Sequence, residues 1–322
     1  MPEKIISIKD LKVYFPVEKA FTDNTLKAEK RFVHAVDGIS LDVFKGETIA
    51  LVGESGCGKS TIGRTIVGLN KKTEGEIYIP GCSSEKELRK KIQYVFQDPY
   101  SSLNPRMTVR TVLERPMKNF SLHSNNREER IAELMTQVGL SSEQMDRYPH
   151  EFSGGQRQRI SIARSLAAEP EFIIADEPTA ALDVSIQAQI LNLLMELKEK
   201  LGLTMLFISH DLSVVRQISD RVVVMYLGKL VEEGTTSEIF ENPLHPYTRS
   251  LLNAVPKGPF AIKKDDVRLR GSIPSPIDPP NGCRLHPRCP FATEACNEND
   301  PEFISVSDTR RVACPVCVKI DK

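Results

Sequence analysis

The order of apolar and polar positions predicts strands in the first fifty residues of the chain. Residues 5–15 (IISIKDLKVYF) alternate between apolar and polar, as a half-buried strand does. Residues 34–53 (HAVDGISLDVFKGETIALVG) change from alternating to continuous apolar character, which is typical of a strand that becomes buried on both faces. The polar stretch from Val17 to Arg31 between them predicts a surface loop.

Further along, the pattern alternates between helices and short buried strands. Residues 154–168 predict a helix capped by Ser153, and residues 171–178 (EFIIADEP) and 204–210 (TMLFISH) predict strands on either side of a helix at 185–202. This alternation indicates an α/β fold with a mostly parallel sheet covered on both faces. Another helix is predicted at 127–140, where apolar residues recur at helical spacing before a glycine stop: Ile131, Leu134, Met135, Val138 and Gly139.

The composition changes after about residue 254, where prolines become frequent. With 322 residues the chain is long enough for one large domain and an appendage. We therefore expect a domain at 1–254, with a helical subdomain at about 98–165, and a loop-rich C-terminal extension at 255–322.

Charge and hydropathy exclude some classes of function. Lys and Arg together number 43, as do Asp and Glu, so there is no global electrostatic case for nucleic acid or an anionic membrane as the main partner. The longest apolar runs fall far short of the ~20 residues that span a bilayer. The N-terminus (MPEKIISIKD) carries charges where a secretory signal needs an apolar core, which predicts a cytosolic chain with reduced thiols.

The stretch GESGCGKST matches the phosphate-binding pattern G-x-x-x-x-G-K-[ST] and lies between a predicted strand and a predicted helix. In such a loop backbone N–H groups wrap the phosphates, Lys59 reaches the terminal phosphates, and Ser60 binds Mg²⁺. The alternative is a glycine-rich turn with a solvent-facing lysine. The predicted nucleotide-binding residues of the loop are Gly53, Glu54, Ser55, Gly56, Cys57, Gly58, Lys59, Ser60 and Thr61.

Two acidic residues end the predicted strand at 171–178. Asp176 can hold Mg²⁺ through water, and Glu177 can polarise an attacking water molecule. The alternative role for the pair is to cap the following turn.

The stretch FSGGQRQRISIARSLAAEP, from Phe152 to Pro170, resembles the signature of the ATPases of ABC transporters. In that family this sequence lies at a helix N-terminus and binds the γ-phosphate held by a second copy of the domain. The residues agree with the resemblance, because a hydroxyl, glycine N–H groups and a positive helix end form an anion site. The residues concerned are Ser153, Gly154, Gly155 and Gln156.

The resemblance covers roughly residues 5–255 and implies a P-loop NTPase-type fold with antiparallel N-terminal strands, and it assigns further roles. Gln97 resembles the glutamine that contacts Mg²⁺ and water, and Asp183 lies in a stretch (ALD) similar to the loop that crosses the dimer interface. His210 resembles the histidine that contacts the γ-phosphate. Phe15, or Tyr14 beside it, resembles the aromatic residue that stacks on adenine. The chain departs from the commonest family pattern at two positions. Phe152 replaces leucine before the SGGQ stretch, and Cys57 replaces a small residue in the phosphate loop. Neither change removes a required side-chain contact.

Four stretches resemble the ATPase subunits of dipeptide and oligopeptide permeases: residues 95–109, 147–160, 241–252 and 282–292. The insertion at Val17–Arg31 resembles the F-type of the two paralogous ATPases of such importers. The resemblance implies a heterodimer with the paralogue, two transmembrane permease subunits, an extracytoplasmic peptide-binding protein, and a place on the cytoplasmic face of the membrane. The alternatives are an importer for nickel or another small solute, a non-transport ABC ATPase, and a homodimer.

Five of the seven cysteines lie in the extension. Cys283, Cys289, Cys296 and Cys314 are separated by five, six and seventeen residues, and Cys317 follows. Four thiolates in a loop-rich segment can hold Zn²⁺ or an iron-sulfur cluster, and the spacing matches neither the zinc-ribbon nor the ferredoxin pattern. The family resemblance favours a structural [4Fe-4S] cluster on the first four. Zinc, free or crosslinked thiols, and a redox sensor are the alternatives.

Overall fold

The computed structural model describes residues 3–17, 31–254, 267–314 and 316–317. Most of the Val17–Arg31 insertion therefore lies outside the described residues. The chain forms two compact units. The first unit comprises Met1–Ile5, Val43–Thr48 and Ile79–Ile208, and the second comprises Ile6–Asp42, Ile49–Tyr78 and Ser209–Lys322.

Three parallel strands form the sheet of the first unit. The central strand, β6 (Phe172–Asp176), pairs with β5 (Ile92–Val95) on one edge and with β7 (Thr204–Ile208) on the other. All five residues of β6 and of β7 are buried, which explains their continuous apolar character. The crossover between them is helix α7 (Val184–Leu201). The parallel strands and the crossover helix confirm the predicted α/β fold.

Helix α6 (Gly154–Leu166) begins at the predicted cap. The Ser153 hydroxyl accepts the Gln156 backbone N–H, and the Gln156 side chain accepts the Ser153 backbone N–H. A Cβ atom on Gly155 would lie 2.5 Å from Ile186 Cγ2, so this glycine lets α6 approach α7 closely. The other helical elements of the unit are α2 (Glu85–Lys91), α3 (Pro99–Ser102), α4 (Val109–Asn119), α5 (Arg127–Gln137), η1 (Ser142–Gln144) and η2 (Pro149–Glu151).

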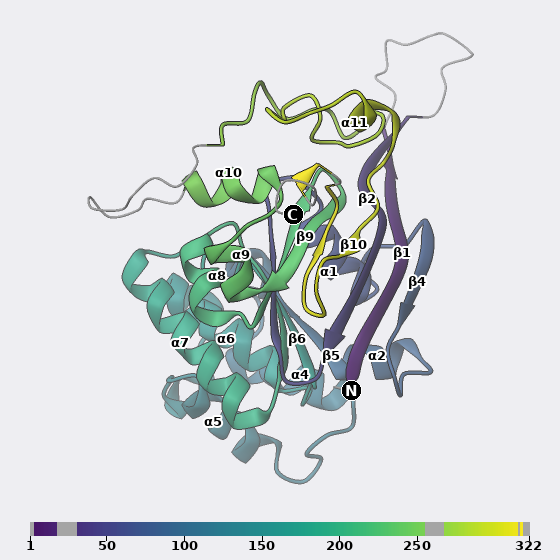
Figure 1. The fold of residues 1–322 in the computed structure, drawn as a ribbon. Coiled ribbons are helices and arrows are strands. Elements are labelled where there is room, and N and C mark those ends of the chain that lie inside the picture. The colour runs from purple at the N-terminus through teal and green to yellow at the C-terminus, as the bar shows by residue number, and fades with distance from the viewer. Residues whose placement is uncertain (1–2, 18–30, 255–266, 315, 318–322) are drawn as a thin grey trace, which may run out of the picture. The chain divides into compact units, whose positions relative to one another are not determined.

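The second unit contains two groups of strands. In one, β1 (Lys4–Pro16) lies between β2 (Phe32–Phe44) and β4 (Glu74–Tyr78), and the long strands β1 and β2 run side by side (Figure 1). In the other, β3 (Thr48–Val52) pairs in parallel with β8 (Arg221–Tyr226). The antiparallel β1–β4 pair confirms the predicted antiparallel N-terminal strands.

The C-terminal extension adds strands to the second unit. From β8 the sheet continues antiparallel through β9 (Lys229–Thr235), β11 (Arg311–Val312) and β10 (Ile304–Ser305). The sequence did not predict β10 and β11, because strands of two residues leave no periodic pattern. The helices of the unit are α1 (Lys59–Ile66), α8 (Leu212–Ile218), α9 (Thr236–Glu241), α10 (Pro246–Ala254) and α11 (Ala295–Glu298).

Candidate nucleotide site

The predicted phosphate loop, Gly53–Thr61, joins β3 to the first turn of α1 in the second unit. Gly53 and Gly58 have φ of 155° and 109°, and a Cβ atom on either would lie within about 2.1 Å of a backbone oxygen. Only glycine fits these two positions. The loop therefore exposes its backbone at the positive end of a helix, the arrangement that binds phosphates in P-loop proteins.

Lys59 folds back over the loop. Its Nζ donates hydrogen bonds to the carbonyl oxygens of Gly53 (2.8 Å) and Glu54 (3.0 Å), and lies 3.9 Å from Cys57 Sγ. Burial raises the pKa of the Cys57 thiol. The ammonium group is thus held on loop carbonyls.

Three of the predicted residues meet at the carboxyl ends of β5 and β6 in the first unit. Asp176 ends β6 and accepts a 2.6 Å hydrogen bond from the hydroxyl of Tyr94. Glu177 follows with φ of 44°, a strained value for a non-glycine residue, and its carboxylate accepts a 2.9 Å hydrogen bond from Gln97. Tyr94 is not among the residues that the sequence predicted for this site; the signal for it is a tyrosine in a buried strand, whose hydroxyl needs a partner.

The signature residues and Asp183 lie at two helix N-termini of the first unit. Ser153 is exposed and caps α6, and Asp183 caps α7 by accepting the Ile186 backbone N–H at 3.0 Å. Ser153, Gly154 and Gln156 keep accessible surface, whereas Gly155 is buried in the helix packing.

The remaining predicted nucleotide contacts lie in the second unit. His210 is exposed between β7 and α8. Phe15 is 39% exposed near the end of β1. Tyr14, the alternative adenine contact, donates a hydrogen bond to Asp37 and packs on the His34 ring at a centroid distance of 4.3 Å. Partial burial, with the bond to Asp37, raises the pKa of Tyr14.

Four of the five cysteines of the extension converge on one cavity of about 490 Å³. Cys283, Cys289, Cys296 and Cys314 all line it, and the backbone N–H of Cys283 bonds to the Cys296 carbonyl at 2.9 Å. Burial raises the pKa of Cys283 to about 11, and the neighbouring cysteines add to the effect. Cys317 does not line this cavity; its hydrogen bond to Cys314 lowers the pKa of the Cys314 thiol.

The described side chains of the extension do not form a site for a single metal ion. Among the residues that the structure describes, no three His, Cys, Asp or Glu side chains are placed to bind one ion together. The cysteine cavity thus brings four thiols to one place without holding them at the spacing of a mononuclear site.

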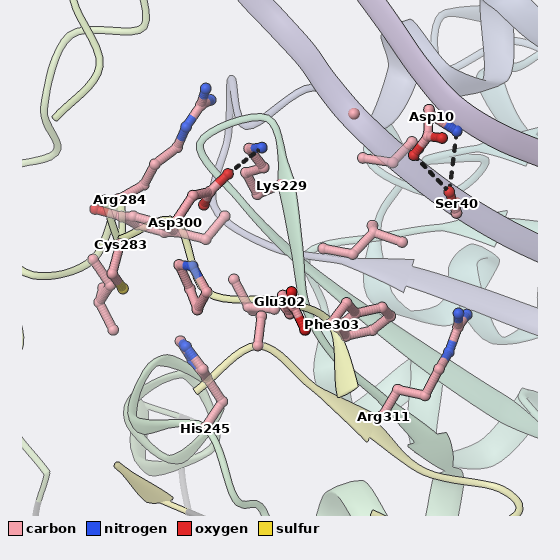
Figure 2. A pocket seen from close by; sticks show the side chains of 18 residues that line it. Asp10, Ser40, Lys229, His245, Cys283, Arg284, Asp300, Glu302, Phe303 and Arg311 are labelled. Atoms are coloured by element: carbon pink, nitrogen blue, oxygen red, sulfur yellow. Dashed lines mark hydrogen bonds and ion pairs between the residues drawn. The ribbon is translucent and has the colours of Figure 1, made fainter. Parts of the chain in front are cut away.

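An adjacent cavity of about 370 Å³ lies where the extension meets β2 and β9 (Figure 2). Lys229 points toward Asp300 in it, with Nζ 2.7 Å from the carboxylate, and Asp10 bonds to Ser40. His245, Cys283 and Leu285 line both cavities. The ion pair between Lys229 of β9 and Asp300 thus joins the extension to the strands at this cavity.

Two family models match the chain. The model described as "ABC transporter" matches residues 36–180, and the model described as "Oligopeptide/dipeptide transporter, C-terminal region" matches residues 231–296. Solved structures agree with the first match. The cbiO1 protein of Clostridium perfringens, part of the ABC transporter complex cbiONQ, is 30% identical with a TM-score of 0.62, over 74% of this chain and 92% of that one. The ATP-binding cassette MJ0796, in a post-hydrolysis state bound to ADP and Pi, is 30% identical with a TM-score of 0.61, over 72% and 98%.

Full-length relatives narrow the class. The chain is 51% identical to the oligopeptide transport ATP-binding protein AppF of Bacillus subtilis (strain 168), over 97% of both chains. It is 50% identical to the dipeptide transport ATP-binding protein DppF of Haemophilus influenzae, over 94% of both, and 47% identical to OppF of Escherichia coli (strain K12), over 98% and 96%.

The fold, the phosphate loop and these matches define an ABC-type ATPase. Within that class, the chain belongs to the family of ABC transporter ATP-binding proteins that includes AppF, DppF and OppF. In the described part of the chain, no helix has the length and apolar character needed to cross a bilayer.

Proposed function

We propose that this chain is the ATP-hydrolysing subunit that energises the import of di- and oligopeptides by an ABC transporter. One observation carries the proposal: a phosphate loop with its lysine in place occurs in the same chain as a C-terminal region matched by the oligopeptide/dipeptide transporter model. We assign residues 1–254 to the ATP-binding domain, with its helical subdomain at about 98–165, and residues 255–322 to the extension.

The assembly follows from the same proposal. The chain pairs with a paralogous ATPase subunit on the cytoplasmic face of the membrane, docks on two transmembrane permease subunits, and works with an extracytoplasmic peptide-binding protein. No nucleic acid takes part. ATP lies between the phosphate loop of one ATPase subunit and the signature helix of the other.

Within this chain, the loop N–H groups bind the phosphates and Lys59 exchanges its carbonyl partners for phosphate oxygens. Phe15 stacks on adenine, since Tyr14 is engaged by Asp37. Glu177, positioned by Gln97, orients and polarises the attacking water, and His210 contacts the γ-phosphate. Ser153, Gly154, Gly155, Gln156 and Asp183 serve the ATP of the partner subunit.

A hydroxyl, an amide and a carboxylate are ligands that suit a hard cation. Ser60, Gln97 and Asp176 would hold Mg²⁺, which neutralises phosphate charge when bound. Asp176 is oriented for this role by the Tyr94 hydroxyl.

The extension is proposed to hold a [4Fe-4S] cluster on Cys283, Cys289, Cys296 and Cys314. All four thiols face one cavity of about 490 Å³, and a four-iron cluster accepts one thiolate from each of four cysteines. The convergence of four thiols on one cavity supports this assignment.

Elemental analysis tests the cluster. After anaerobic purification we expect about four Fe and four acid-labile sulfide per chain, with a broad absorption band near ~400 nm that Cys289→Ser removes. One Zn without Fe would identify a zinc site, and no metal would leave free thiols. Cys82→Ser, outside the extension, is the control and should leave the metal content unchanged.

Transport itself is tested in proteoliposomes that contain the chain, its paralogue and both permease subunits. ATP hydrolysis should rise when the binding protein and a defined oligopeptide are added together, and labelled peptide should accumulate. Stimulation by Ni²⁺ with its binding protein instead of peptide would replace this proposal with nickel import.

A further inference from the structure

One contact joins the cysteine-rich extension to the phosphate loop. Nη1 of Arg288, the residue before Cys289, lies 3.1 Å from Glu54 Oε2, and Glu54 is the second residue of the loop. The two side chains are only 11% and 28% exposed. Water therefore screens this ion pair less than it screens a surface pair.

The backbone of Arg288 is hydrogen-bonded through both its N–H and its carbonyl. Its N–H bonds to the Leu285 carbonyl at 2.8 Å, and its own carbonyl accepts the Arg270 N–H at 2.9 Å. Leu285 is 2% exposed, and the next residue, Cys289, lines the cysteine cavity. The guanidinium group also lies 3.4 Å from the Tyr226 hydroxyl. The position of this arginine thus depends on the order of the cysteine-bearing turn.

Glu54 is held from three sides. Its N–H bonds to the Tyr247 hydroxyl at 2.8 Å, its carbonyl accepts Lys59 Nζ at 3.0 Å, and its carboxylate pairs with Arg288. The backbone of Glu54 therefore helps to place Lys59. Its carboxylate, at the edge of a site for a polyanion, would repel phosphates if it were not neutralised.

We propose that Arg288 is a positioning residue of the phosphate loop, which holds and neutralises Glu54 and so increases the affinity for ATP. This role makes nucleotide affinity depend on the folding of the cysteine-rich turn. It rests on the nucleotide role of the loop, and not on the transported solute or on any metal in the extension.

A double-mutant cycle on the full chain tests the proposal, with the dissociation constant of fluorescent mant-ATP in Mg²⁺ as the readout. Arg288→Gln should weaken binding about three- to tenfold, because Glu54 is left unneutralised. In the Glu54→Gln background the same change should have less than half that effect. Arg288→Lys, which keeps the charge, should recover most of the affinity.

The control is Arg311→Gln, which removes another ion pair of the extension, with Glu233, away from the loop. It should leave the dissociation constant unchanged. In ATPase assays Arg288→Gln should raise KM for ATP with kcat changed less than about twofold, whereas general loosening of the fold would change both.

Unchanged binding by Arg288→Gln, or equal losses in both backgrounds, would overturn the proposal while leaving the ATPase function intact. Should Arg288→Gln fail to fold, Glu54→Gln decides, because it should bind mant-ATP at least as tightly as the unmodified chain. Markedly weaker binding by Glu54→Gln would count against neutralisation as the role of Arg288.

Discussion

The side-chain amide of Gln97 donates a 2.9 Å hydrogen bond to the carboxylate of Glu177. The two residues follow neighbouring parallel strands, β5 and β6, and the sheet brings their side chains together although they lie eighty positions apart. Gln97 thereby restrains one carboxylate oxygen of Glu177. A carboxylate held in one orientation is suited to orient a water molecule.

Removing the charge of Glu177 should stop hydrolysis and spare binding. Glu177→Gln keeps the shape of the side chain but loses the group that polarises water, so we expect phosphate release to fall roughly 10²- to 10⁴-fold. Binding of mant-ATP should remain within about threefold. Glu171→Gln is the matched control at the opposite end of β6, where Glu171 pairs with Lys91, and should leave both quantities unchanged. Residual activity above a tenth would exclude Glu177 as the main catalytic group.

Phe15 and Tyr14 are distinguished by what each already contacts. Phe15→Ala should raise the dissociation constant for ATP roughly three- to tenfold, the loss expected for one aromatic stack. Tyr14→Phe keeps the ring and removes only the hydrogen bond to Asp37, so ATP affinity should be unaffected. Equilibrium titration with mant-ATP checks both variants. Unchanged affinity for Phe15→Ala would exclude Phe15 as the adenine contact.

Sequence patterns predicted the parts of this molecule that depend on local chemistry. The phosphate loop needs glycine where a Cβ would strike Met225 or Ala35, and the helix at 154–166 needs Ser153 as its cap, so both leave fixed residue types in the chain. The buried strands of the parallel sheet leave continuous apolar runs for the same reason.

Contacts between distant segments leave no such pattern. The sequence indicated neither that Tyr94 would orient Asp176 nor that Arg288 would pair with Glu54 across 234 positions. Strand β11 pairs with β9 through only two residues, too few for a periodic pattern, so the sequence predicts a loop-rich extension. Each of these depends on tertiary packing, which brings together groups that local propensity does not relate.

A buried ion pair anchors the extension to β9. Glu232 is fully buried and lies 2.7 Å from Arg310 Nη2, while it also accepts the backbone N–H groups of Leu244 and His245. Arg310→Met would leave a buried carboxylate without its counter-charge, so we expect a loss of about 3–5 kcal/mol in the free energy of unfolding.

Urea denaturation measures the effect, and Arg311→Met is the control. Arg311 is 31% exposed and pairs with Glu233 of β9, which keeps Arg221 as a second partner at 3.2 Å, so its loss should cost less than about 1 kcal/mol. Equal costs for the two variants would show that burial of the Glu232–Arg310 pair contributes nothing beyond an ordinary surface pair.

His245 should make stability fall in mild acid. It is 1% exposed, its Nδ1 accepts the Tyr247 N–H at 3.2 Å, and burial lowers its pKa from 6.5 to about 3. Below about pH 6.5 the His245 side chain is protonated in the unfolded chain, whereas in the folded chain it stays neutral down to about pH 3. The folded state is therefore destabilised by up to about 1.4 kcal/mol for each pH unit as the pH falls through this window.

His245→Asn keeps a hydrogen-bond acceptor for Tyr247 but cannot titrate. Urea denaturation of both proteins at pH 7.5, 6 and 5 should show a shallower decline for the variant, since all other titrating groups are shared. Parallel declines would mean that His245 is protonated in the folded protein as readily as in the unfolded chain.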